Sequence, residues 1–328
     1  MKDSPTLQPS PASLVHYCLG VTGLITGPYY RYTTWAGLYS DPWNPAVRTS
    51  GAGWGECETA ALYRARHVPL YLAAFLLSGW LFPLAAVRDS SWQEESSLIW
   101  KLFYMTPIFF NFRMRIYAGF VLSECACLMA GLGCYPSVCE PRPGLGPGRP
   151  ELLSEPGATA GPLSWETVHN IDEWGSDMVG SMREALRCWN MTVQHWLVFT
   201  VYRRFPVKGL RTVAVMLVSS VWHGVHPGYY LSLGSVPLCL AVEDYYRGLV
   251  RTRLSPAGRA RYDWVNWFVR MRWFDYLGMG FLLLQVEPTL AYWAGVCYAG
   301  HLSLILLGLL GVTLVNPVMR RFCTEHQH

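Results

Sequence analysis

The stretch SSVWHGVHPGYY, residues 219–230, lies within a run of 31 residues, 212–242, that contains no Asp, Glu, Lys or Arg. As one straight helix this run would be about 46 Å long, well beyond the roughly 30 Å hydrocarbon core of a bilayer. Pro227-Gly228 is the natural place for a break. A broken helix at membrane depth is tolerated only where it is buried in protein or lines a cavity. The run therefore predicts a membrane protein with interrupted helices.

The composition of the whole chain agrees with a membrane protein. Of its 328 residues, 52% are hydrophobic and only 15% are charged, whereas soluble domains carry about a quarter charged residues. Fifteen tryptophans and nineteen tyrosines fit the aromatic belts of membrane proteins. The net charge of +4 is modest, and no basic run interleaved with aromatics appears, so nucleic acid is not an expected partner.

Several apolar segments are expected to form an all-α, polytopic bundle with broken or re-entrant helices. The first clear candidate, Val68–Val87, has twenty residues and no charge, which suffices to cross a bilayer core. Leu102–Leu132 is apolar but holds Arg113, Arg115 and Glu124. Charges at such depth mark function by default; the alternative is a packing ion pair, for which Glu124 and Arg115 are candidates. Two further apolar segments are Leu277–Tyr298, with a break at Glu287-Pro288, and His301–Val315.

The remaining segments divide the chain around one membrane domain at 14–319. We expect residues 1–13 to be disordered, 141–162 to form a Pro/Gly-rich loop, and 320–328 to be a short polar tail. Residues 165–200 are helical in pattern but partly polar. The charged, amphipathic segment 243–273 is expected to be an interfacial helix.

No metal site is predicted. Ten cysteines are scattered without a paired CxxC set, so they are expected to be free, mostly buried thiols. His223 and His226 form an HxxH pair, but two ligands need at least a third, and Pro227 interrupts the helix directly afterwards.

His223 is the first candidate for chemistry. It lies twelve residues past Arg211, about 18 Å along a helix and so near mid-depth. A neutral imidazole there can act as a general base. The structural alternative is a hydrogen bond from His223 to a backbone carbonyl exposed at the Pro-Gly break, and for a lone histidine this alternative is the stronger one.

A second polar residue changes that balance. In RCWNMTVQHWL, residues 187–197, Asn190 lies between Trp189 and Met191 in an apolar, helical pattern, with Gln194 four residues later on the same face. A buried amide and a buried imidazole are the minimum set for group transfer, because one takes a hydroxyl proton and the other positions the hydroxyl or oxyanion. Helix-packing through polar residues is the alternative for Asn190. Asn-Met-Thr also matches a glycosylation sequon, but its aromatic setting argues against a glycan.

These two strings, WNMTVQHWL and WHGVHPGYY, resemble the Asn and His signature of the membrane-bound O-acyltransferase family, in its lysophospholipid branch. The resemblance runs from about Leu14 to the last apolar segment. It implies that Asn190 and His223 are the catalytic pair and that His226 accompanies them. The segments that carry it, in family order, are GLITGPYYRYTTW (23–35), ETVHNID (166–172), MREALRCWNMTVQHWL (182–197), WHGVHPGYYLS (222–232) and WVNWFVRMRWFDYLGMGF (264–281).

The resemblance also implies a reaction. A fatty acyl group, arachidonoyl-like and polyunsaturated, would pass from acyl-CoA to the sn-2 hydroxyl of lysophosphatidylinositol, at a multi-pass protein of the endoplasmic reticulum membrane. No cofactor or metal is expected, because a thioester is already activated. The basic cluster formed by Arg203, Arg204, Lys208 and Arg211 would hold CoA phosphates or the headgroup, or would serve only as topological charge. The weaker substrate-binding candidates are Trp189, Trp222, His226, Arg203, Arg204 and Arg211.

The chain departs from the family at its start. Family members carry an additional block of transmembrane helices before the segment that matches GPYYRY, so we expect a shortened chain. Three alternatives follow: a non-catalytic isoform, an acyltransferase for another headgroup, and, from another class, a polytopic transporter. An acyltransferase would lose turnover on substitution of His223 and Asn190, whereas a transporter need not depend on both.

Overall fold

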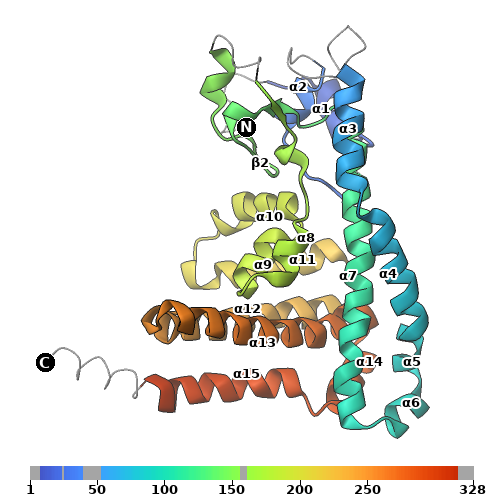
Figure 1. The fold of residues 1–328 in the computed structure, drawn as a ribbon, viewed down its shortest axis with the longest axis vertical. Helices are drawn as coiled ribbons and strands as arrows, with labels where there is room; N and C mark the ends of the chain where they lie inside the picture. Colours follow the sequence, from blue (N-terminus) through green and yellow to red (C-terminus); the bar gives the residue numbers. More distant parts are fainter. Residues whose placement is uncertain (1–7, 24–25, 40–52, 156–160, 317–328) are drawn as a thin grey trace, which may run out of the picture. The chain divides into compact units, whose positions relative to one another are not determined.

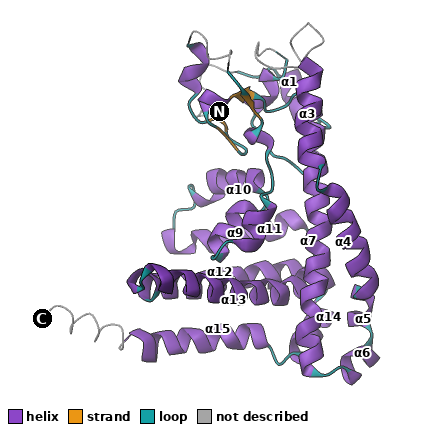
Figure 2. Ribbon diagram, in the orientation of Figure 1, coloured by secondary structure: helices purple, strands orange, loops and turns teal. Residues whose placement is uncertain are grey.

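The computed structural model describes residues 8–23, 26–39, 53–155 and 161–316. These residues form two compact units. Both consist mainly of helices (Figure 2), so the expected all-α class is confirmed. The first unit gathers the described parts of Met1–Ala73, Met114–Glu173 and Arg187–Thr200; the second gathers the described parts of Ala74–Arg113, Trp174–Leu186 and Val201–His328.

The first unit is built from short helices around an apolar core. Cys127, Leu132 and Val168 lie at the centre of this core and are almost completely buried. Helix α1 begins at Pro11, with Ser10 as its N-cap and the Ser10 hydroxyl accepting the Ser13 N–H. The helices are α1 (Pro11–Cys18), α2 (Tyr32–Gly37), α3 (Gly53–Ala65), α10 (Met191–Leu197) and the 3-10 turns Ser137–Cys139, Pro150–Ser154 and Glu166–Val168.

Two expectations for this unit need adjusting. The prediction of disorder over 1–13 is wrong from Pro11 onward, where α1 starts; residues 1–7 lie outside the described part of the chain. The loop at 141–162 carries short elements, although 156–160 are also outside the description. The strands form two antiparallel pairs, β1 (Tyr135–Pro136) with β4 (Leu163–Ser164) and β2 (Pro141–Arg142) with β3 (Gly146–Pro147).

The second unit is a helical bundle in which α12 and α13 run side by side (Figure 1). Its core includes the buried side chains of Cys239, Leu240, Tyr276, Met279 and Tyr292. Four helices contribute residues to both units: α4 (Val68–Leu81), α7 (Leu98–Met129), α8 (Glu173–Met178) and α9 (Met182–Cys188). The others are α5 (Leu84–Arg88), α6 (Ser90–Glu95), α11 (Arg211–His223), α12 (Pro227–Leu249), α13 (Pro256–Leu283), α14 (Val286–Gly295) and α15 (Ala299–Leu310), which a π turn, Gly311–Val315, extends.

The predicted break at Pro227-Gly228 is confirmed. It packs against a second break, between α13 and α14. Helix α11 ends at His223 and α12 begins at Pro227. The Gly228 N–H donates to the Leu284 carbonyl oxygen at 2.7 Å, just after α13 ends. A Cβ on Gly228 would lie 2.8 Å from the Leu284 Cα. Glycine is therefore required here, because the two interrupted helices meet backbone to backbone.

Other predicted boundaries are wrong. Pro83 divides the expected helix at 68–87 into α4 and α5. No boundary falls at 242/243, because α12 continues to Leu249. The expected break at Glu287-Pro288 lies earlier, at Leu284 and Gln285, since Pro288 is tolerated in the first turn of α14. The helical pattern at 165–200 forms α8, α9 and α10, and the apolar segment expected at 301–315 is helical.

Membrane-spanning length was tested over the described residues. None of their helices is, by itself, both long and apolar enough to cross a bilayer; α14 together with α15 and its π turn passes as a pair bent by 63°.

The contact at Gly228 yields a stability prediction. We expect Gly228→Ala to lower the free energy of unfolding by about 1–3 kcal/mol, the usual cost of overpacking an interior. Gly234→Ala, in the same helix but with nothing within 4 Å of the added Cβ, is the matched control and should be neutral or stabilising by about 0.5–1 kcal/mol. Thermal unfolding of the detergent-solubilised protein measures both. Equal unfolding temperatures for the two variants would contradict the backbone contact.

Candidate functional site

The predicted site residues are divided between the two units. Trp189 and Asn190 belong to the first unit. The second unit holds the remaining candidates: Arg203, Arg204, Arg211, Trp222, His223 and His226. Each group is therefore described within its own unit.

Asn190 does not lie within a helix, contrary to the sequence pattern. Trp189 and Asn190 separate α9 from α10, and Asn190 adopts a left-handed conformation with φ 48° and ψ 53°. Asparagine is among the few residues that tolerate these angles. Its carbonyl accepts the Gln194 N–H at 2.9 Å as the first bond of α10. The expectation that Asn190 and Gln194 share a helical face is thus replaced by a helix-start geometry.

The Asn190 side chain is the notable group at this junction. Its Oδ1 is buried and has no hydrogen-bond partner in the described residues, and the side chain does not cap α10. Polar packing between helices, the structural alternative, would require a partner for this oxygen. A buried amide left unpaired is costly, so the observation favours a group that meets a ligand.

The neighbours of Asn190 are held firmly. The Trp189 ring packs against Tyr117 and Phe120 of α7, with centroid separations of 5.8 and 6.0 Å. On the other side, the Met191 N–H donates to the Asn170 carbonyl oxygen at 2.7 Å. Asn170 is fully buried. The junction is thus fixed at both of its flanks.

Glu124 of α7 anchors the same region, and its predicted partner was wrong. It pairs with Arg64 of α3 rather than with Arg115. Its Oε1 also accepts the backbone N–H groups of Asn170 and Ile171, at 2.8 and 3.0 Å. This buried charge therefore satisfies an irregular backbone segment, which is a structural role.

His223 is the last residue of α11. Its ring meets Phe281 edge-to-face with centroids 4.9 Å apart, and Tyr229 at 5.6 Å. His223 is an exposed residue, and within the described residues neither ring nitrogen makes a hydrogen bond. The alternative in which His223 binds a carbonyl at the Pro-Gly break is therefore not observed. Aromatic packing orients the ring and leaves its nitrogens available to a substrate.

His226 and Trp222 take different places from His223. His226 is the N-cap residue of α12, and its carbonyl accepts the Tyr229 N–H at 3.1 Å. Its Nδ1 lies 3.4 Å from Gln285 Nε2, beside the second break. Trp222 is 62% exposed. His226 thus helps to form the start of α12, directly after the break.

The basic cluster lies at the opposite end of α11 from His223. Arg203 and Arg204 are exposed in the turn that follows the π turn Val198–Tyr202. Arg211 begins α11, donates to the Phe205 carbonyl at 3.1 Å and stacks over a tyrosine ring. A helix of this length separates Arg211 from His223 by about 18 Å. The structure therefore keeps these charges away from His223.

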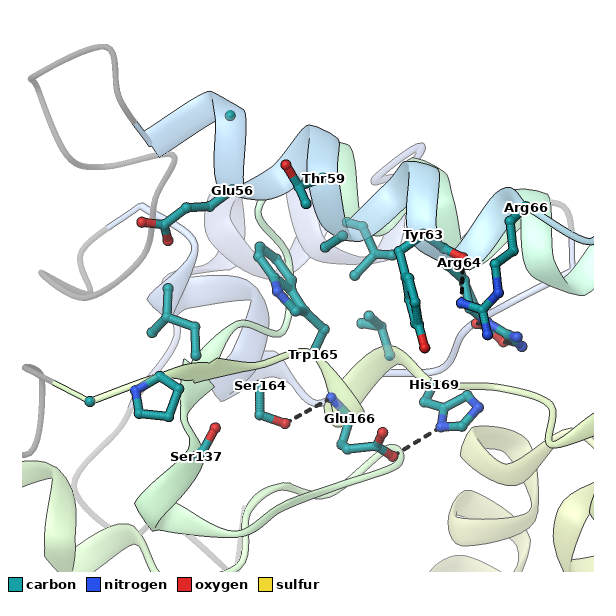
Figure 3. A pocket seen from close by; sticks show the side chains of 18 residues that line it. Glu56, Thr59, Tyr63, Arg64, Arg66, Ser137, Ser164, Trp165, Glu166 and His169 are labelled. Carbon is teal, nitrogen blue, oxygen red and sulfur yellow. Dashed lines mark hydrogen bonds and ion pairs between the residues drawn. The ribbon is translucent and has the colours of Figure 1, made fainter.

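A broad pocket of about 1460 Å³ opens in the first unit between α3 and residues 161–169 (Figure 3). None of the predicted site residues lines it. Four of its charged or titratable groups are paired: His169 Nδ1 lies 2.9 Å from Glu166 Oε2, and Arg64 binds Glu124. In the described part of the chain, no three His, Cys, Asp or Glu side chains gather to hold a metal ion.

The Glu166–His169 pair shifts both pKa values. Burial alone would lower the pKa of His169, but the hydrogen bond to Glu166 and the nearby carboxylates outweigh it, and the pKa is raised. His169 Nε2 also lies 3.0 Å from the Ile171 carbonyl oxygen, so the imidazolium finds an acceptor at each nitrogen. The hydrogen bond from His169 lowers the pKa of Glu166.

Comparison with known proteins places the chain in a family. The model of the membrane-bound O-acyltransferase family matches residues 3–285. The chain belongs to the membrane-bound O-acyltransferase family. It is 42% identical over 306 residues to the membrane-bound acylglycerophosphatidylinositol O-acyltransferase MBOAT7 of Mus musculus and, equally, of Homo sapiens. The Drosophila melanogaster protein of the same description, frj, is 32% identical over 307 residues.

Each alignment covers a larger fraction of this chain than of the relative. The alignments cover 92% of this chain and 63% of the mouse and human proteins, and 94% and 61% for the fly protein. This membrane-bound O-acyltransferase chain therefore spans less than two thirds of the length of the curated relatives that it matches.

Sequence reasoning missed two groups of residues at the site. Asn170 lies in the string ETVHNID, but that polar segment carries no periodicity that would place its asparagine beside Asn190. Phe281 lies 58 positions after His223, and only the packing of α13 on α12 reveals that contact. The nine cysteines among the described residues form no disulfide, which confirms the expectation of free thiols for them.

The Glu166–His169 pair yields a prediction for pH dependence. Because the His169 pKa is raised, its stabilisation is present below the usual value of about 6.5 and is lost as pH rises through the raised value. The lowered pKa of Glu166 gives stabilisation above about 4.5 that is lost as pH falls. His169→Gln should therefore lower the unfolding temperature more at pH 6 than at pH 8. The exposed Glu155→Gln is the control, and an equal loss at both pH values would refute the pairing.

Proposed function

We propose that this chain transfers a fatty acyl group from acyl-CoA to the sn-2 hydroxyl of lysophosphatidylinositol. Two findings support the proposal: membership of the membrane-bound O-acyltransferase family, and 42% identity to relatives described as acylglycerophosphatidylinositol O-acyltransferases. The observation that carries it at the level of residues is the buried, unpartnered amide oxygen of Asn190.

His223 is the proposed general base. Its ring is oriented by Phe281 and Tyr229, and both nitrogens are available. It takes the proton of the sn-2 hydroxyl as that oxygen attacks the thioester carbonyl. The tetrahedral intermediate then expels the CoA thiolate, which receives the proton back from the imidazolium. His223 thus ends the reaction in its starting state.

Asn190 is the proposed positioning group for the reacting oxygens. Its amide N–H can donate to the oxygen of the substrate hydroxyl or to the developing oxyanion, while the hydroxyl proton goes to His223. A group already held in place stabilises that charge without reorganising during the reaction. The left-handed backbone and the anchored flanks of Asn190 provide this rigidity.

The chemistry also suits a membrane setting without a cofactor. A thioester is activated toward attack, so proton transfer and oxyanion stabilisation suffice in this proposal. The acceptor and the acyl chain are lipids, and we place the chain as a multi-pass protein of the endoplasmic reticulum membrane. A polyunsaturated acyl chain is proposed from the family resemblance alone.

The basic residues are assigned to anionic substrate groups. Arg211 lies about 18 Å along α11 from His223, and Arg203 and Arg204 precede α11 in the chain, so we assign the three to a phosphate remote from the reacting carbonyl. Such a phosphate belongs either to CoA or to the inositol headgroup. Arg203 is exposed, so its guanidinium group is accessible to such a ligand.

A second candidate function is binding without turnover. Such a chain would insert into the membrane and bind lipid or a partner, but it would not turn over.

The test is an acyl-transfer assay on microsomes from cells that lack the endogenous enzyme. With arachidonoyl-CoA and a panel of lysophospholipids, we expect turnover selective for lysophosphatidylinositol. His223→Ala should lower kcat by about 10²–10⁴-fold, and Asn190→Ala by about 10²–10³-fold, since they remove a general base and an oxyanion group. The exposed His16→Ala is the matched control and should be unchanged. Absence of turnover by an inserted, folded chain would reject catalysis in favour of the second candidate.

A further inference from the structure

Asn190 lies in the junction between α9 and α10. One neighbouring segment, residues 170–172, holds the conformation of this junction. Residues 170–172 contact the chain on both sides of Asn190. The Asp172 N–H donates to the Cys188 carbonyl at 3.0 Å, before the junction, and the Met191 N–H donates to the Asn170 carbonyl at 2.7 Å, after it. The segment therefore brackets Asn190 through backbone bonds alone.

The Asn170 side chain adds a specific bond to this bracket. Its Oδ1 accepts the Thr192 hydroxyl at 2.6 Å. The same hydroxyl oxygen accepts the Tyr29 N–H at 2.8 Å. Asn170 and Thr192 are both fully buried. A buried hydroxyl with one donor and one acceptor in place has little freedom to rotate, so Thr192 is locked two residues after Asn190.

The ion pair of Glu124 with Arg64 anchors the backbone of Asn170. Glu124 Oε1 accepts the N–H groups of Asn170 and Ile171, and Arg64 binds Glu124 while donating to the Ile171 carbonyl at 2.7 Å. Charge-assisted bonds of this kind are stronger than neutral ones. Asn170 is thus a rigid support rather than a mobile loop residue.

We propose that Asn170, acting through Thr192, is a positioning residue that holds the Asn190 amide in its reactive orientation. This inference rests on the proposed acyl transfer. Asn190 carries no hydrogen bond on its own Oδ1, so its placement comes from the backbone on either side of it. Displacing a catalytic group by about 1 Å can cost on the order of 100-fold in rate. Among the described residues, loss of the Asn170–Thr192 bond leaves the Met191–Asn170 backbone bond as the only bond from Asn170 to the chain after Asn190, and so loosens that side.

The test compares substitutions that differ by one functional group. Thr192→Val removes the hydroxyl at nearly constant shape, Thr192→Ser keeps it, and Asn170→Ala removes the acceptor. We expect Thr192→Val and Asn170→Ala to lower kcat about 10- to 100-fold, with the KM for acyl-CoA unchanged, and Thr192→Ser to recover most of the turnover. Thr200→Val removes a hydroxyl that bonds only its own helical turn, at the Trp196 carbonyl, and is the matched control.

Thermal unfolding of each variant, with turnover assayed well below its midpoint, separates positioning from loss of folded protein. Wild-type kcat in folded Thr192→Val and Asn170→Ala would overturn the inference while leaving acyl transfer intact. Unfolding of both variants below the assay temperature would assign the network to folding and overturn the inference as well. No turnover by the wild type would instead reject the proposed function, and this inference with it.

Discussion

The structure depends on one constraint: every backbone polar group at an interrupted helix needs a partner in an apolar setting. Buried charged side chains supply several of these partners. Glu124 accepts two backbone N–H groups at 170–171 in the first unit. In the second unit, both Glu243 carboxylate oxygens accept the Met182 N–H at the start of α9. Arg270, fully buried, donates to the carbonyls of Ser176 and Asp177 near the end of α8.

This constraint explains why the candidate site lies at breaks rather than inside helices. A break frees the chain to turn, and the partners that satisfy it also hold the neighbouring side chains still. Asn190 occupies the junction between α9 and α10, and His223 ends α11 directly before Gly224. Within the described residues, neither side chain makes a hydrogen bond to the backbone of its own break, because other groups supply those bonds. Both side chains therefore remain available for chemistry.

Parts of this arrangement were predictable from sequence. The uncharged run at 212–242 was too long for one helix, and Pro227-Gly228 marked its break correctly. Free thiols and the all-α class also followed from composition and spacing. The charges within α7 were recognised as unusual, but the partner of Glu124 was not Arg115, because Arg64 comes from another helix 60 positions earlier. Sequence periodicity describes neighbours within one helix and gives no information on such long-range pairs.

The site shows the same division between local and tertiary information. The string WNMTVQHWL has a helical pattern, yet Asn190 adopts a left-handed conformation because Asn170 fixes the following residues. Pro83 and Pro288 show that a proline in the sequence does not by itself mark where a helix is interrupted. Pro83 separates α4 from α5 and is the N-cap residue of α5, whereas Pro288 is the third residue of α14. Position relative to the helix start decides the effect of proline.

We propose that Asn190 and His223 serve one reaction. Effects of residues that act as a unit are strongly non-additive. The most direct test is therefore the lysophosphatidylinositol acyl-transfer rate of Asn190→Ala, His223→Ala and the double variant, each corrected for folded, inserted protein. If both residues act in one reaction, the acyl-transfer rate of the double variant is expected to be no lower than that of the slower single variant. Losses that multiply, or wild-type turnover in either single variant, would contradict it.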